Sequence, residues 1–269
     1  MPQTRDRTDP RIIAISNQKG GVGKTTTTIN LAAGLADLGF RCLIVDLDPQ
    51  GNASTGLGVG SDDRTSTTYD LLAGTSAPDE IIRASGVENV WISPATQDLA
   101  SADIDLMSTD RRNFLLRKSL RSDGIAGFAF DFILIDCPPS LNLLTINAMV
   151  AADSVLVPLQ SEFFALEGLS QLMLTIREIR QTANTALRIE GVVLTMFDGR
   201  NNLSQMVEQD AREALGDLVF DTIVPRAVRV SEAPSFSMPV LHYDPHSKGS
   251  VAYRALAQEV VDRRSRTAA

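Results

Sequence analysis

Residues 11–26 read RIIAISNQKGGVGKTT, and this stretch decides the fold. It begins with an apolar run from Arg11 to Ser16, continues as a glycine-rich loop and passes at Lys24 and Thr25 into a segment with helical spacing. A strand, a glycine-rich loop ending in Lys-Thr and a helix together predict a phosphate-binding loop. In such a loop backbone N–H groups turn toward the phosphates, and the helix N-terminus adds a partial positive charge. We therefore expect Lys24 to hold the β and γ phosphates of a nucleotide and the Thr25 hydroxyl to bind Mg²⁺.

Apolar runs of strand length recur along the chain, and they are continuous rather than alternating, at residues 11–16, 41–46, 130–136, 154–158 and 189–195. Continuous runs are typical of strands that are covered on both faces of a parallel sheet. Helical spacing is found between them, for example over residues 25–38, after which Gly39 is a stop signal, and over residues 167–180. The alternation predicts an α/β fold with a doubly wound, mostly parallel sheet flanked by helices, whose ligand site lies at the carboxyl ends of the strands.

The length and composition bound the organisation of the chain. With 269 residues, 43% of them apolar, it can bury one large core, so we expect a single P-loop domain over residues 11–262. Residues 65–121 are polar and helix-rich and are expected as an insertion packed against the sheet, in which residues 91–94 are able to add a strand. Residues 1–10 and 263–269 are expected to be flexible.

Charge and cysteine content exclude several classes of protein. The net charge of −8 argues against a surface that coats nucleic acid everywhere, so any DNA contact must come from a local basic patch. Cys42 and Cys137 lie in apolar runs and are expected to be buried, unpaired thiols, while His242 and His246 are expected at the surface or in packing. The start of the chain lacks the apolar core of a signal peptide, and no uncharged apolar stretch approaches the roughly 18–20 residues that span a bilayer. These features predict a soluble, cytoplasmic protein.

Carboxylates follow two of the predicted strands. Asp46 and Asp48 end the second run, and Asp136 ends the third. Strand-end carboxylates in such a sheet point at the crevice that holds the phosphate-binding loop, so they are able to reach Mg²⁺ or its water ligands. Capping of the next helix is the alternative role for Asp136.

The glycine-rich loop departs from the general pattern at Gln18, which stands where a glycine is usual, and at the second lysine, Lys19. The sequence Lys19-Gly-Gly-Val-Gly-Lys-Thr25 resembles the deviant P-loop of the ParA, MinD and nitrogenase-iron-protein group. Residues 46–52, DLDPQGN, and residues 134–140, LIDCPPS, resemble the Walker A′ and Walker B segments of ParA-type ATPases. The similarity to ParA/Soj partition proteins covers the chain from Ile12 to about Val260, through segments that include residues 158–169, 194–203 and 223–234.

The resemblance implies roles for individual residues. Lys19 acts in trans on the nucleotide of a second subunit, Asp48 orients the attacking water, and Asp46 and Asp136 support Mg²⁺ or its hydration shell together with Thr25. The catalytic residues are then Lys19, Lys24 and Asp48. The ATP-binding residues are Lys19, Gly20, Gly21, Val22, Gly23, Lys24, Thr25 and Thr26, with Pro225 and Ala227 beside the adenine. Relatives carry Asn where this chain has Ala227, which removes one side-chain contact and leaves the backbone groups.

The same resemblance implies a function. It predicts an ATPase, weak alone, whose ATP-bound sandwich dimer binds nonspecific double-stranded DNA in the nucleoid and is released when a ParB-type partner stimulates hydrolysis. It places DNA contact on Arg200 and Arg229, with Arg226, Lys248 and Arg254 as weaker candidates. Phosphate neutralisation by such a patch gives affinity without reading sequence, and a dimer doubles the patch. For any one arginine, a solvated surface role is the alternative.

Other functions are less well supported by the sequence. A MinD-like membrane-positioning ATPase needs an amphipathic C-terminal anchor, and residues 260–269 carry little apolar surface. An iron–sulfur carrier needs cysteines in exposed loops. A sequence-specific repressor needs a helix-turn-helix, for which about ten residues before the first strand are too few. A scaffold that binds ATP without hydrolysis, for example in positioning protein clusters, stays open until turnover is measured.

Overall fold

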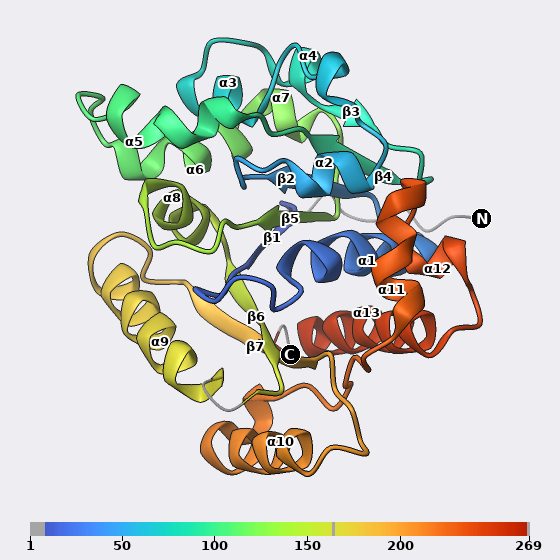
Figure 1. The fold of residues 1–269 in the computed structure, drawn as a ribbon. Coiled ribbons are helices and arrows are strands. Elements are labelled where there is room, and N and C mark those ends of the chain that lie inside the picture. Colours follow the sequence, from blue (N-terminus) through green and yellow to red (C-terminus); the bar gives the residue numbers. More distant parts are fainter. Residues whose placement is uncertain (1–8, 163–164, 268–269) are drawn as a thin grey trace.

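The computed structural model describes residues 9–162 and 165–267, and within them a seven-stranded sheet crosses the molecule in the order β3-β4-β2-β5-β1-β6-β7 (Figure 1). The strands are β1 Arg11–Ile15, β2 Cys42–Asp46, β3 Arg83–Ala84, β4 Val90–Ser93, β5 Phe132–Asp136, β6 Ser154–Gln160 and β7 Arg188–Thr195. Neighbouring strands are parallel except for the β3–β4 pair, which is antiparallel. The predicted mostly parallel α/β sheet is therefore confirmed.

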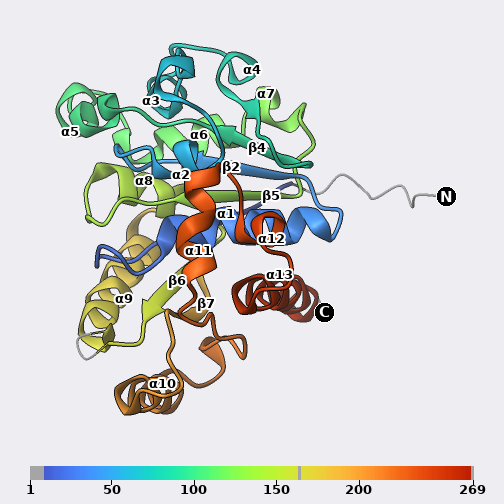
Figure 2. The ribbon, with the colours of Figure 1, turned by 45° about the vertical axis from the view of Figure 1, so that its right-hand side comes forward.

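Helices cover both faces of this sheet. One face carries α3 Thr68–Ala73, α4 Pro78–Ile81, α5 Ala102–Asp105, α6 Leu115–Leu120, α7 Asp123–Ala126, α8 Leu143–Ala151, α9 Ala165–Thr182 and α10 Asn202–Leu215. The other carries α1 Lys24–Asp37, α2 Asn52–Gly56, α11 Val228–Glu232, α12 Val240–Tyr243 and α13 Lys248–Thr267. Figure 2 shows α10 beyond the β7 end of the molecule and α3, α4 and α7 at the β4 end.

The strands divide their side chains between two cores. In β1, Ile12 and Ala14 enter the core beneath α8 and α9, while Ile13 and Ile15 enter the core beneath α1 and α13. Both sets are fully buried. Burial on both sides explains why the strands were visible in the sequence as continuous apolar runs.

Helix α1 lies between the sheet and α13, and Gly34 makes this close packing possible. A Cβ atom at Gly34 would lie 2.8 Å from the Cβ atom of Ala257 in α13, so a larger residue would push the helices apart. The helix begins one residue after Gly23, as the predicted order of strand, loop and helix requires. The packing fixes the N-terminus of α1 at the carboxyl ends of the strands.

The segment 65–121, expected as an insertion packed against the sheet, contributes β3 and β4 to the sheet itself. Residues 91–94, singled out as a potential strand, fall largely in β4, which pairs in parallel with β2. Trp91 is held there by the ring of Phe130, 5.5 Å away between centroids, and by the guanidinium of Arg41, 4.3 Å from its ring centroid. How the chain divides into domains stays a prediction.

The C-terminal helix enters the stretch expected as a tail, because α13 continues to Thr267. Arg263 explains part of this extension, since its guanidinium donates to the Val219 carbonyl at 3.0 Å and pairs with Glu259 at 3.0 Å. Residues 1–8 and 268–269, also expected to be flexible, lie outside the described residues. None of the described helices combines the length and the apolar character that a membrane span requires.

Candidate active site

The phosphate-binding loop lies between β1 and α1, and its backbone leaves the start of α1 uncapped. Gly23 is the N-cap residue, with a left-handed φ of 87°, and no side chain caps the helix there. The first N–H groups of a helix have no partners within it, so an uncapped N-terminus is suited to an anion. The sequence prediction of a phosphate site therefore matches the backbone geometry.

Lys24 is buried, and its ammonium group lies over the loop, where Nζ donates to the Lys19 carbonyl at 3.1 Å. Burial lowers the pKa of Lys24, and the nearby charges of Asp136 and Asp48 oppose that shift. The charged form of Lys24 is thus less well solvated than that of an exposed lysine. A phosphate group would supply the missing compensation.

Two carboxylates face each other across neighbouring strands, because the register pairs Asp46 of β2 with Asp136 of β5. Asp46 accepts hydrogen bonds from the backbone N of Ser54 at 2.8 Å and from its hydroxyl at 2.6 Å, yet burial raises the pKa of Asp46 to about 6. Burial, together with the charge of Asp46, raises the pKa of Asp136 to about 8. The protein therefore does not fully compensate the negative charges of Asp46 and Asp136.

The donor set fits Mg²⁺. Oδ2 of Asp136 is buried and has no hydrogen-bond partner among the described residues, while the hydroxyl of Thr28 donates to Oδ1 at 3.1 Å. The Thr25 hydroxyl is near enough to oppose the rise in the pKa of this carboxyl. Within the described ranges no group of three or more His, Cys, Asp or Glu side chains is arranged to hold a metal ion alone. Mg²⁺ usually binds through one or two carboxylates, retained water and substrate phosphates, so Asp136 and Thr25 beside a phosphate site meet its needs.

Asp48 follows β2 and lies at the same edge. Its backbone N donates to Asp46 Oδ1 at 3.3 Å, and its own Oδ1 accepts from the backbone N of Gln50 at 3.0 Å. The side chain is held by this turn and is largely buried. Its charge opposes the lowering of the Lys24 pKa, so the structure brings two of the three predicted catalytic residues, Lys24 and Asp48, close together.

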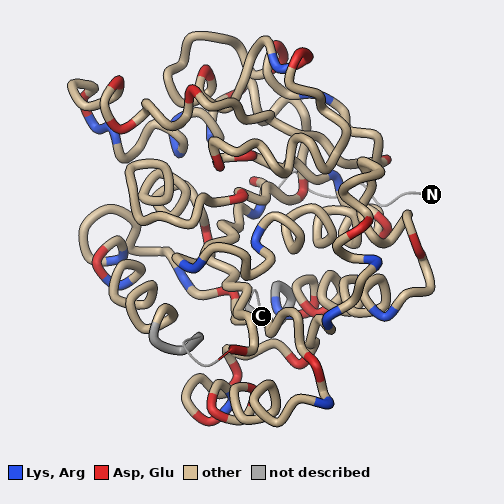
Figure 3. The backbone as a smooth tube through the Cα atoms, in the orientation of Figure 1, with Lys and Arg blue, Asp and Glu red and all other residues tan. Residues whose placement is uncertain are grey.

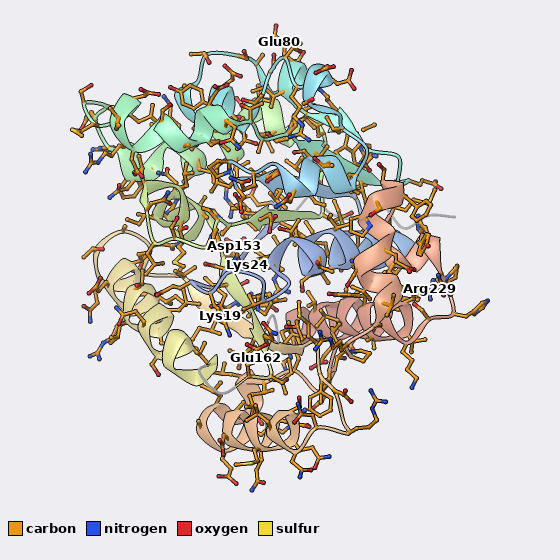
Figure 4. All side chains as sticks on the ribbon, in the orientation of Figure 1. Lys19, Lys24, Glu80, Asp153, Glu162 and Arg229 are labelled. Carbon is orange, nitrogen blue, oxygen red and sulfur yellow. The ribbon has the colours of Figure 1, made fainter. Side chains whose placement is uncertain are left out.

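Lys19 lies on the more exposed side of the loop, and Figure 4 shows it between Lys24 and Glu162. Its Nζ pairs with Glu162 Oε2 at 2.7 Å, and the side chains are 40% and 50% exposed. A cavity of about 420 Å³ opens here, lined in part by Lys19, Glu162, Met196 and Arg226. Lys19 is therefore paired within its own chain while remaining accessible from outside.

The residues expected beside the adenine lie at the end of β7. The backbone N of Phe197 donates to Val224 O at 3.1 Å, and the backbone N of Arg226 donates to Phe197 O at 2.9 Å. These bonds place Pro225 and Ala227 at the same edge of the sheet as the phosphate-binding loop.

Acidic and basic residues are interspersed along the described part of the backbone (Figure 3). Arg200 is 92% exposed and makes a two-pronged contact with Asp198, with both distances 3.1 Å. Arg229 of α11 pairs with Glu232 at 2.9 Å and with Asp244 at 3.4 Å. Each of these arginines already has a carboxylate partner.

The weaker candidates differ among themselves. Arg226 is exposed, and its charge helps to lower the pKa of Asp198, which is the ion-pair partner of Arg200. Arg226 and Arg200 therefore lie near the same carboxylate. Arg254 donates to the carbonyls of Pro245 and Leu241 at 2.7 and 3.2 Å and lies 3.6 Å from Asp37, so its guanidinium already has partners within the chain. Lys248 is exposed at the start of α13.

The cysteines and histidines take no part in the site. Cys42 and Cys137 are free and buried, as predicted, and burial raises the pKa of both thiols. His242 and His246 are both exposed, and Nε2 of His242 lies 3.5 Å from Asp37 Oδ1.

Several residues that build the site were not predicted, namely Thr28, Ser54, Glu162 and Thr195. Thr28 had a usable signal, since it follows Lys24 by one helical turn and shares its face. The others meet their partners only through the fold, and nothing in the local sequence marks them.

Comparison with known proteins gives a consistent assignment. The AAA domain family model matches residues 10–189. The chromosome partitioning protein ParA of Caulobacter vibrioides is 53% identical over 253 residues, 94% of each chain. The sporulation initiation inhibitor protein Soj of Bacillus subtilis is 50% identical over 250 residues, 93% of this chain and 98% of Soj.

Solved structures agree with this. Cobyrinic acid a,c-diamide synthase from Mycobacterium smegmatis, with a bound ATP analog and magnesium, has a TM-score of 0.79 and 35% identity over 93% of each chain. The septum site-determining protein MinD of Pyrococcus horikoshii, complexed with Mg-ADP, has a TM-score of 0.74 and 30% identity over 93% of this chain and 96% of its own. With its P-loop, its strand-end aspartates and relatives that match it over nearly their whole length, this chain belongs to the ParA/Soj family of chromosome-partitioning ATPases.

Proposed function

We propose that this chain binds ATP and Mg²⁺ in the crevice around Lys24 and hydrolyses ATP to drive a DNA partition cycle. The observation that carries the proposal is the set of buried, poorly compensated charges at the uncapped start of α1, with Lys24 on one side and Asp46 and Asp136 on the other. In a magnesium-bound triphosphate, the phosphates compensate the positive charge of Lys24 and the metal ion compensates the negative charges of Asp46 and Asp136. The two cores on the faces of one sheet support treating residues 11–262 as a single ATPase domain.

The residues divide the work of phosphoryl transfer, in which positioning and charge neutralisation matter more than covalent chemistry. Lys24 and the N–H groups of the loop hold the β and γ phosphates. Thr25 and Asp136 hold the metal side, and Asp46 supports its water ligands. When bound, Mg²⁺ neutralises charge on the phosphate oxygens. Asp48 orients the attacking water, and its turn at the end of β2 keeps the carboxylate in place.

Lys19 joins two subunits in this proposal. Its ammonium group leaves Glu162 and binds the nucleotide of a second copy of the chain, so that two ATP molecules lie between two subunits. The partial exposure of the Lys19–Glu162 pair supports this, since a surface ion pair contributes only about 0.2–1 kcal/mol and a triphosphate easily replaces it. Gly20 is exposed, and a Cβ atom there would meet nothing within 4 Å in its own subunit.

Gly20 gives a clean test of the sandwich. Gly20→Val should leave the subunit folded and able to bind nucleotide but block the close approach of a second subunit. Lys19→Ala should likewise stay monomeric with ATP. The measurement is light scattering after size-exclusion chromatography, with and without ATP. A normal ATP-dependent dimer of both variants would rule out the sandwich.

The ATP-bound dimer binds double-stranded DNA without sequence preference, through Arg200 and Arg229, and a ParB-type partner stimulates hydrolysis and releases it. The main experiment measures phosphate release with DNA, with a candidate ParB-type protein, and with both. We expect slow turnover alone and the fastest turnover with both. Asp48→Ala should bind ATP and DNA but accumulate as a dimer. Equal turnover in Asp48→Ala and the parent would remove Asp48 from its role, and no turnover under any condition would favour a scaffold.

A further inference from the structure

The carboxyl end of β7 contacts the phosphate-binding loop, although β6 lies between β7 and β1 in the sheet. The hydroxyl of Thr195, the last residue of β7, donates to the backbone carbonyl of Val22 at 2.9 Å. Thr195 is 2% exposed and Val22 is 1% exposed, so the bond is shielded from water. A buried carbonyl that loses its donor is left without a replacement from solvent.

The bond determines the direction of the next peptide N–H. The described chain contains no cis peptide, and in a trans peptide the carbonyl of Val22 and the N–H of Gly23 point in opposite directions. Because Thr195 holds the carbonyl, the N–H of Gly23 is aimed away from β7. Among the described residues no carbonyl or side chain accepts a hydrogen bond from it. It therefore joins the free N–H groups at the start of α1.

Side-chain packing supports the same arrangement. A Cβ atom at Gly23 would lie 3.8 Å from Cε of Met196 and 4.0 Å from Cβ of Thr195, so these two side chains back the loop at that point. Met196 itself has a left-handed φ of 51°, which is uncommon for a residue with a side chain. The end of β7 thus supplies both a hydrogen bond and a packed surface behind the loop.

We propose that Thr195 is a positioning residue for nucleotide binding. Its hydroxyl keeps the Val22 carbonyl turned toward β7, so that the Gly23 N–H is directed at the phosphates before the nucleotide arrives. This rests on the proposed nucleotide site. Without the hydroxyl, the carbonyl turns to other partners in the free protein, and the peptide must turn back each time a nucleotide binds. The cost then appears in the dissociation constant, and not only in the stability of the fold.

The test compares Thr195→Val, which removes the hydroxyl with little change of shape, with Thr195→Ser, which keeps it. Thr68→Val is the matched control, because the buried hydroxyl of Thr68 donates to the Ser93 carbonyl at 3.0 Å at the distant β4 edge. One readout is the Kd for MgADP, which needs no turnover. The other is the amide chemical shift of Gly23 in the nucleotide-free protein, which reports the orientation of the peptide between Val22 and Gly23. Thr195→Ala, which adds no new contact, takes the place of Thr195→Val if that variant does not fold.

For Thr195→Val we expect a Kd raised about tenfold, the usual size of a lost buried hydrogen bond, and a changed Gly23 amide chemical shift. Thr195→Ser should stay within about twofold of the parent. Thr68→Val should lower the unfolding temperature without changing either readout. A parent-like Kd in folded Thr195→Val, or the same rise in Thr68→Val, would overturn the positioning role alone. Failure of the parent to bind MgADP would overturn the nucleotide site as well.

Discussion

The crevice at the start of α1 and the exposed surface that carries Arg200 and Arg229 both hold charges, but under opposite conditions. In the crevice Lys24, Asp46 and Asp136 are buried and incompletely compensated by the protein, as the lowered pKa of the lysine and the raised pKa values of the aspartates indicate. On the surface, Arg200 and Arg229 are exposed and each is already paired with a carboxylate.

This difference separates two kinds of binding. A buried charge without compensation lowers the stability of the free protein, and a ligand of opposite charge restores that stability when it binds. Removal of such a charged side chain therefore changes the affinity for the ligand strongly. An exposed, paired charge is screened by water and salt, and its exchange from one partner to another changes the free energy little. The crevice is suited to tight, specific binding of one ligand. The exposed arginines are suited to weak, reversible contacts, which give useful affinity only when several of them act together.

The largest effect is expected for Lys24→Ala. Removal of the lysine leaves the carboxylates without their nearest cation and the phosphates without a charged donor, so the affinity for MgATP should fall by on the order of 10²–10³-fold. Calorimetric titration measures this affinity. Lys248→Ala is the control, because it also removes one lysine, but an exposed one at the start of α13 and outside the phosphate-binding loop. A loss of less than about fivefold would remove the crevice from the nucleotide site.

A smaller effect is expected for Asp136→Asn, which should weaken the response to Mg²⁺ but stabilise the nucleotide-free protein. The amide keeps the shape but carries no charge, so the magnesium concentration for half-maximal nucleotide binding should rise about 10–100-fold. The nucleotide-free protein should become more stable, because the buried carboxylate that repels Asp46 is gone. Thermal unfolding without ligand and titration with Mg²⁺ test the two signs separately. The alternative role for Asp136 as a cap of the next helix is wrong, because Asn142 caps α8 and its side chain accepts from the backbone N of Thr145. If Asp136 had only another structural role, the stability would fall and the magnesium dependence would stay unchanged.

The sequence predicted the crevice better than it predicted the surface, for a physical reason. The order of strand, glycine loop and helix, and the aspartates at strand ends, are local patterns whose geometry follows from a parallel sheet. Contacts such as Thr195 with Val22 or Ser54 with Asp46 join residues far apart in the chain, and no local pattern encodes them.

The arginines show the same limit. The charge of the arginines was visible in the sequence, but Asp198 was not recognised as the partner of Arg200. The two residues are close in the chain, yet whether their side chains meet depends on the conformation of the loop between them. Residues 91–94 were recognised as a potential strand and fall largely in β4, whereas the two-residue strand β3 had no local signal, because it exists only through its antiparallel pairing with β4.

On the surface, Arg200→Glu should weaken binding to nonspecific DNA by about tenfold at moderate salt. It removes a phosphate contact and adds a repelling charge, and it should reduce the slope of log K against log salt by about 1. Binding to a labelled duplex at several salt concentrations measures both, with Arg254→Glu as the comparison, since Arg254 is held by backbone carbonyls. An unchanged salt slope in Arg200→Glu would place the DNA contact elsewhere.

The smallest effect, and the one with the opposite sign, is expected for Asp198→Asn. The variant frees Arg200 from its ion pair and removes a negative charge from the surface, so DNA affinity should rise, by at most about fivefold because exposed pairs are weak. Asp62→Asn, at another exposed aspartate, is the control for the change in net charge alone. If Asp198→Asn instead weakens DNA binding while Asp62→Asn does not, the carboxylate holds the guanidinium in the orientation that DNA needs. The pairing of surface arginines would then be part of the binding geometry and not a competitor of it.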